Sequence, residues 1–146
     1  MAILWEKSKV VLLQRVWLGI AVALLAAGCG DGNQPGFPDL HPVTGVVTKG
    51  GSPVSGGVVK FTPVPDNPDF LINSEVGPDG TFSLSTVRTT DTRGERKPGV
   101  APGQYTVTYI PVAGDQTAGY QPPVTLPDPV TVEAKANELT IELSGS

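Results

Sequence analysis

The stretch QYTVTYIPV, residues 104–112, decides the fold class of this chain. Its side chains alternate, with Tyr105, Val107 and Tyr109 on one face and threonines on the other. Successive side chains of an extended strand point to opposite faces of a sheet, and aromatic and β-branched residues favour such strands. The stretch therefore predicts a β-strand with one face in a core and the other in solvent.

The same period of two returns along the chain between clusters of glycine, proline and aspartate. Such segments, with turn residues at intervals of about 8–12 residues, are typical of β-sandwiches. We expect one all-β domain, a Greek-key β-sandwich of about seven strands, in which KAN at 135–137 is a hairpin turn between the last two strands. The expected strands are 43–47, 56–64, 70–76, 81–87, 104–112, 129–134 and 138–144. The side chains expected to point inward are Val43, Val47, Val59, Phe61, Phe82, Leu84, Tyr105, Val107, Tyr109, Val130, Val132, Leu139, Ile141 and Leu143.

The first thirty residues have a different composition. Lys7, Lys9 and Arg15 precede VWLGIAVALLAAG at residues 16–28, which contains no charge. A basic start, a short apolar segment and an exit of small residues are the parts of a secretory signal peptide, so we expect a signal helix here. Thirteen residues form about 20 Å of helix, less than the roughly 30 Å hydrocarbon core of a bilayer, which argues against a permanent membrane span.

The single cysteine of the chain, Cys29, follows this segment directly. The sequence LAAGC at residues 25–29 resembles the lipobox of bacterial lipoproteins, although that family favours leucine where this chain has Ala26. The resemblance implies that residues 1–28 are a cleaved lipoprotein signal peptide and that the Cys29 thiol carries a diacylglyceryl group. Two or three acyl chains would hold the protein durably to a membrane. The alternative is an ordinary secreted protein, or an uncleaved anchor, with an incidental cysteine.

Residues 29–41 are polar and rich in glycine and proline, which predicts a flexible tether before the domain at 42–144. Without the signal, seven basic and thirteen acidic residues remain, a formal charge of −6. This acidic balance argues against nucleic acid and anionic lipid head groups as partners. With Cys29 lipidated, no thiol is left for a disulfide, so a packed core has to stabilise the fold.

Several glycine and proline motifs resemble those of a known family. Motifs similar to the signatures of carboxypeptidase regulatory-like domains, relatives of the transthyretin-like sandwich, are VTGVV at 43–47, GSPV at 51–54, GVVKFTP at 57–63, DGTFSL at 79–84 and GVAPGQYTV at 99–107. The resemblance covers about residues 42–144. It implies a transthyretin-like (prealbumin-like) fold and an accessory, non-catalytic role, of the kind found in many short lipoproteins.

Two segments are long enough to be binding loops on a rigid sheet. Residues 86–99 hold four of the seven remaining basic residues, interleaved with two acids, and residues 110–127 are nearly uncharged. A solvated, self-neutralising hairpin is the alternative for the basic segment. The side chains expected to contact a partner are Arg88, Arg93, Arg96, Lys97 and Tyr120.

We expect no catalytic site, no metal site and no cofactor. His41 is the one histidine, and the serines lack a G-x-S-x-G motif. PDNPDF at 65–70 lacks the ligand spacing of a calcium loop. The transthyretin-like hydrolases of 5-hydroxyisourate, which the resemblance brings into consideration, rely on several histidines.

The expected protein is a membrane-anchored lipoprotein of the cell envelope that faces the periplasm or the exterior. Its sandwich is expected to be a monomeric, non-catalytic module that contacts an envelope protein or polysaccharide through its loops or an open sheet edge. A structural spacer without a specific ligand is the alternative, and a hydrolase is the third.

Overall fold

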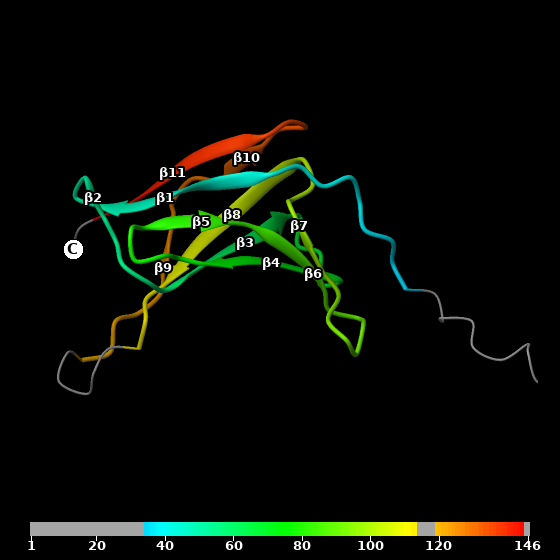
Figure 1. Ribbon diagram of the computed structural model, residues 1–146, viewed down its shortest axis with the longest axis horizontal. Coiled ribbons are helices and arrows are strands. Elements are labelled where there is room, and N and C mark those ends of the chain that lie inside the picture. Colours follow the sequence, from blue (N-terminus) through cyan, green and yellow to red (C-terminus); the bar gives the residue numbers. More distant parts are fainter. Residues whose placement is uncertain (1–33, 114–118, 145–146) are drawn as a thin grey trace, which may run out of the picture. The chain divides into compact units, whose positions relative to one another are not determined.

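Residues 34–113 and 119–144 are described by a computed structural model, and they form strands without a helix (Figure 1). Two β-sheets pack against each other, which confirms the expected all-β sandwich. Eleven strands are present in this part of the chain rather than about seven, because short strands at 52–53, 96–98 and 124–125 add to the expected ones and one expected strand is divided. The strands are β1 (Val43–Lys49), β2 (Ser52–Pro53), β3 (Val58–Val64), β4 (Phe70–Glu75), β5 (Thr81–Ser83), β6 (Ser85–Arg88), β7 (Arg96–Pro98), β8 (Gly103–Ile110), β9 (Val124–Thr125), β10 (Val130–Val132) and β11 (Asn137–Leu143).

The smaller sheet is built around β1. Strand β11 lies parallel to β1 along its whole length, from the Val43–Asn137 pair to the Lys49–Leu143 pair. On the other side of β1, β5 pairs with its first half and β2 with its end, both antiparallel. The alternation of side chains does not specify the parallel pair, because a period of two gives the facing of a strand but not its direction.

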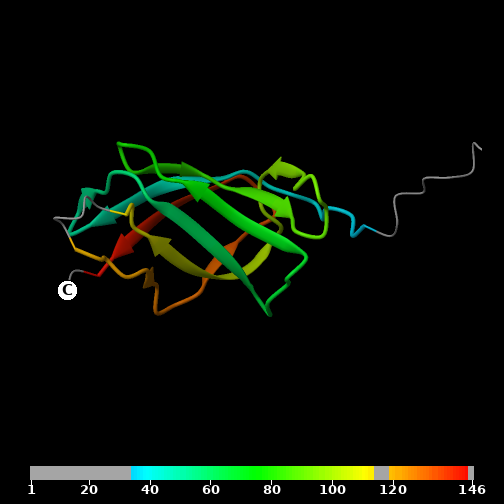
Figure 2. The same ribbon diagram turned by 90° about the horizontal axis from the view of Figure 1, so that it is seen from below.

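The larger sheet has the strand order β10–β8–β3–β4–β6–β7, with β9 also beside β8. Figure 2 shows β3, β4 and β8 side by side in this sheet. Strands β3 and β8 form its longest antiparallel pair. Tyr105, Val107 and Tyr109 are buried on the inner face of β8, as the alternation predicts.

The segment 81–87, expected to be one strand, passes from one sheet to the other at Leu84. Strand β5 pairs with β1 in the smaller sheet, and β6 pairs with β4 in the larger sheet. At the crossing, the Leu84 amide donates to the Val43 carbonyl oxygen at 2.9 Å, and the Leu84 carbonyl oxygen accepts from the Gly99 amide at 3.0 Å. The prediction of a single strand is wrong here, because alternation persists where a strand bends from one sheet into the other.

The hairpin expected at KAN, residues 135–137, does not form, because β10 pairs with β8 and β11 pairs with β1. Asn137 stabilises the connection: its side-chain oxygen accepts from the Glu133 amide at 2.9 Å, and its side-chain nitrogen donates to the Glu133 carbonyl oxygen at 3.0 Å. The chain thus crosses between the sheets at this turn. Val132 and Ile141 reach the same core from opposite sheets, and each is 1% exposed.

The core between the sheets consists mainly of valine and aromatic side chains. The Phe61 ring is 1% exposed, and its centroid lies 6.0 Å from that of Tyr105 and 6.5 Å from that of Phe82. All side chains expected to point inward are buried except Val130 and Leu139, which are partly buried and pack against the core. Three further core residues are Ile72, Val76 and Val100.

The segment before β1 forms no strand, but it lies against the sandwich. The Phe37 ring centroid lies 5.5 Å from the Phe70 ring centroid. The Arg88 guanidinium and the Lys97 Nζ atom lie 4.7 Å and 4.6 Å from the Phe37 centroid. The compact unit begins at Pro35, so the last part of the segment expected to be a flexible tether belongs to the domain.

The expected signal peptide, Cys29 and the first part of the expected tether lie outside the described residues. Predictions about them stay predictions. No helix in the described part of the chain is long and apolar enough to cross a membrane.

Candidate ligand pocket

The two segments expected to be binding loops lie at opposite ends of the strands (Figure 1). In the larger sheet, Arg88 of β6 pairs with Phe70 at the start of β4. Ile110 of β8 is opposite Val58, which is itself opposite Glu75 at the end of β4. The two segments therefore leave the sheet about 17 Å apart along the strand direction, and they do not form one site.

The basic segment is a β-hairpin formed by β6 and β7, and its cations contact residues of the sandwich. Arg88 donates to a Glu95 carboxylate oxygen at 2.9 Å, and the Lys97 Nζ atom lies 3.7 Å from the other oxygen of that carboxylate. Arg96 Nη1 donates to Asn73 Oδ1 at 3.1 Å. These contacts match the self-neutralising hairpin that is the alternative interpretation of the sequence. They involve three of the four basic side chains expected to contact a partner.

Arg93 and Tyr120 are also exposed, as Arg96 and Lys97 are. The backbone amide of Arg93 donates to Asp91 Oδ1 at 2.8 Å, while its side chain is exposed. Tyr120 is 87% exposed and precedes Gln121, which lines a pocket. The structure thus places these two candidates at opposite ends of the domain.

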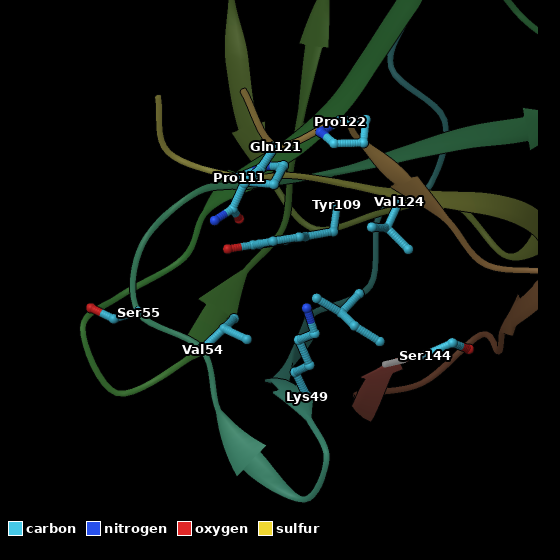
Figure 3. A pocket seen from close by; sticks show the side chains of 10 residues that line it. Lys49, Val54, Ser55, Tyr109, Pro111, Gln121, Pro122, Val124 and Ser144 are labelled. Carbon is cyan, nitrogen blue, oxygen red and sulfur yellow. The ribbon is translucent and has the colours of Figure 1, made fainter. Parts of the chain in front are cut away.

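A pocket of about 330 Å³ opens where β1, β8 and β11 end. Figure 3 shows the side chains of Lys49 (β1) and Tyr109 (β8) in the pocket, with Gln121 drawn on the side of Tyr109 away from Lys49. The volume is near the lower limit of pockets that bind small molecules, which is about 300 Å³. The lining residues are Lys49, Val54, Ser55, Tyr109, Pro111, Gln121, Pro122, Val124, Leu143 and Ser144.

Two glycines allow the backbone to pass close to the Tyr109 ring. Gly57 has a φ angle of 93°, and a Cβ atom at this position would lie 2.7 Å from the Tyr109 hydroxyl oxygen. The Tyr109 hydroxyl donates to the Gly56 carbonyl oxygen at 2.8 Å. Burial raises the pKa of Tyr109 above its ordinary value of 10.0, so the hydroxyl keeps at neutral pH the proton that it donates to Gly56, and its oxygen can still accept a hydrogen bond.

Lys49 gives the pocket its positive charge. Lys49 has the same register on β1 as the buried Val43 and Val47, but it stands at the end of the strand and is exposed. Within the described residues, no acidic side chain forms an ion pair with Lys49 and none lines the pocket. The neighbouring acid on β11, Glu142, lies on the other face of the sheet and accepts a hydrogen bond from Thr48 Oγ1, which holds the pKa of Glu142 below its ordinary value.

The groups around the pocket supply one ammonium group, hydroxyl and amide hydrogen bonds, and apolar contact, which are the components of a binding site. His41 lies elsewhere, where its backbone pairs with that of Val100 before β1. Within residues 34–113 and 119–144, no cluster of three or more metal-ligating side chains occurs.

Sequence motifs identify neither Lys49 nor Tyr109 as a site residue. The signal for Lys49 is the alternation itself, because counting by two from Val43 and Val47 gives a lysine the same register at the end of a strand. Tyr109 carries no such signal. Its position in a pocket depends on how residues 111 and 121–124 cover the end of β8, and the sequence pattern does not give that arrangement.

No known protein family matches the chain, and searches of curated proteins and of solved structures find no similar protein.

Proposed function

We propose that the chain is a lipid-anchored protein of the cell envelope whose β-sandwich binds an envelope protein or polysaccharide without catalysing a reaction. The lipobox-like LAAGC at residues 25–29 supports the anchor, and the resemblance to carboxypeptidase regulatory-like domains supports an accessory, non-catalytic sandwich. The pocket and the exposed Tyr120 support binding at one end of that sandwich.

One observation carries this proposal: the N-terminal segment and the pocket lie at opposite ends of the strands. Phe37 contacts Phe70 and Arg88 at the start of β4, and Tyr109 is near the other end of the sheet. Phe37 follows Cys29 by eight residues, which can span at most about 28 Å. An anchor at Cys29 would therefore be joined to the domain at its Phe37 end, with the pocket at the other end of the strands.

The anchor is tested by the Cys29→Ser substitution and palmitate labelling. Because the thiol is the acylated atom, this variant should lose all label and accumulate as the unprocessed precursor. The matched control is Ser52→Ala, which keeps Cys29 and should label normally. Normal labelling of Cys29→Ser would show that the lipobox assignment is wrong.

Binding is tested by placing a photo-crosslinking amino acid at Gln121, beside the pocket, and at Arg93, on the opposite hairpin. In intact envelopes we expect a discrete crosslinked species from Gln121 and none from Arg93. The reverse pattern would contradict binding at the pocket end.

A structural spacer without a specific ligand is the second candidate. The separation of the two long segments favours it, since Arg93 and Tyr120 do not form one compact binding site. Absence of a crosslinked species from both Gln121 and Arg93 would support the spacer.

A further inference from the structure

The charge in the pocket indicates the class of ligand. Lys49 lines the pocket at the exposed end of β1, the described lining residues include no carboxylate, and Glu142 accepts a hydrogen bond from Thr48 on the other face of the sheet. An ammonium group beside apolar walls favours an anionic partner, because charge-assisted hydrogen bonds are stronger than neutral ones. Among the described lining residues Lys49 is the one cation, and one ammonium group balances a single negative charge.

The neutral polar groups favour an amide close to that negative charge. The Tyr109 hydroxyl donates its hydrogen to the Gly56 carbonyl oxygen, so toward a ligand it can act only as a hydrogen-bond acceptor. The Gln121 side chain can both donate and accept a hydrogen bond. A ligand N–H group could therefore bind beside the carboxylate.

Apart from Ser55 and Ser144, the remaining lining side chains are apolar. Val54 and Val124 are partly buried against the core, and Leu143 belongs to the core. Proline rings at positions 111 and 122 complete these walls. With about 330 Å³ available, a short aliphatic side chain fits this space better than an extended chain.

We propose that this pocket binds a carboxylate that carries an adjacent amide and a short apolar side chain. The C-terminus of a polypeptide and a free N-acylated amino acid share this chemistry. In this arrangement Lys49 binds the carboxylate, Tyr109 accepts from the amide N–H, and Val54 and Val124 contact the side chain. The proposal deepens the binding function proposed above and rests on it.

The test is an NMR titration of the full-length chain in detergent micelles, with the methyl groups of Val54 and Val124 as reporters. The probes are N-acetylvaline and N-acetylvalinamide, which differ in the carboxylate. We expect N-acetylvaline to shift the signals of both reporters with a dissociation constant of about 1 mM or lower. N-acetylvalinamide should bind at least about tenfold more weakly.

Lys49→Met keeps most of the aliphatic side chain and removes the charge, so it should weaken N-acetylvaline binding about tenfold while the methyl spectrum stays folded. Lys60→Met is the matched control, because Lys60 is an exposed lysine on β3 outside this pocket. Its affinity should stay within about twofold of the original. An unchanged affinity of Lys49→Met would overturn the assignment.

Acetyl-Gly-Gly-Val and its C-terminal amide separate the two sources of the carboxylate. Tighter binding of the free-acid peptide than of N-acetylvaline supports a polypeptide C-terminus, and equal or weaker binding supports a small free acid. If neither acid shifts the reporters at about 10 mM, the assignment is wrong. If the acids do not bind but Gln121 still gives a crosslinked species, the proposed binding function stands and only the carboxylate assignment fails. If a carboxylate binds but no crosslinked species forms in envelopes, only the protein or polysaccharide partner is contradicted.

Discussion

Replacement of Phe37 by alanine tests whether the segment before β1 is part of the folded domain. The ring contacts Phe70 with a centroid distance of 5.5 Å, and two cations lie 4.6 Å and 4.7 Å from it. An aromatic pair contributes about 0.5–1.5 kcal/mol, and each cation–π contact at an exposed site about 0.5–1 kcal/mol. Because neighbouring contacts are not additive, we expect Phe37→Ala to lower the free energy of unfolding by about 2 kcal/mol.

The assay is urea unfolding of a chain that starts at Gly30, followed by far-UV circular dichroism. Phe37→Leu is the matched control, because it keeps the apolar contact and loses the ring. It should lower the free energy of unfolding by about half as much as Phe37→Ala. A double-mutant cycle with Lys97→Met should give a coupling energy of about 0.5–1 kcal/mol. A loss below about 0.5 kcal/mol for Phe37→Ala, which is usual for an exposed position, would refute this reasoning and support a flexible tether up to residue 41.

Two further predictions concern the core and its titration. Gly45→Ala should cost about 2–3 kcal/mol in urea unfolding, because a Cβ atom there would overlap the Leu139 carbonyl of β11 and lie 2.8 Å from the Phe82 ring. Gly36→Ala, which meets nothing within 4 Å, should be neutral, and equal effects of the two substitutions would contradict the close β1–β11 pairing. Burial raises the pKa of Tyr105 above its ordinary value of 10.0, so its contribution to stability is complete below pH 10 and is lost as the pH rises through the folded-state pKa. The urea concentration at the midpoint of unfolding should therefore decrease as the pH rises above about 10. A midpoint that stays constant up to about pH 12 would exclude a buried Tyr105 hydroxyl.

The sequence by itself determined the fold class and the facing of the strands. Alternation places Phe61, Val107 and Ile141 inward, and each is at most 1% exposed. The reason is local, since a side chain's face in an extended strand depends only on whether its position is odd or even. The same rule gives Lys49 the register of Val43 and Val47, but only the tertiary structure shows that it lies at an exposed strand end and lines a pocket.

The tertiary structure alone decided which strands pair and what the basic segment does. The crossing at Leu84 and the separation of β10 from β11 follow from which side chains reach the shared core, and a period of two is the same in either sheet. The contact of Phe37 with Arg88 joins residues 51 positions apart, and no local pattern encodes it. The pocket arises in the same way. Lys49, Tyr109 and Gln121 line one pocket only because strand ends far apart in the sequence lie side by side in the fold.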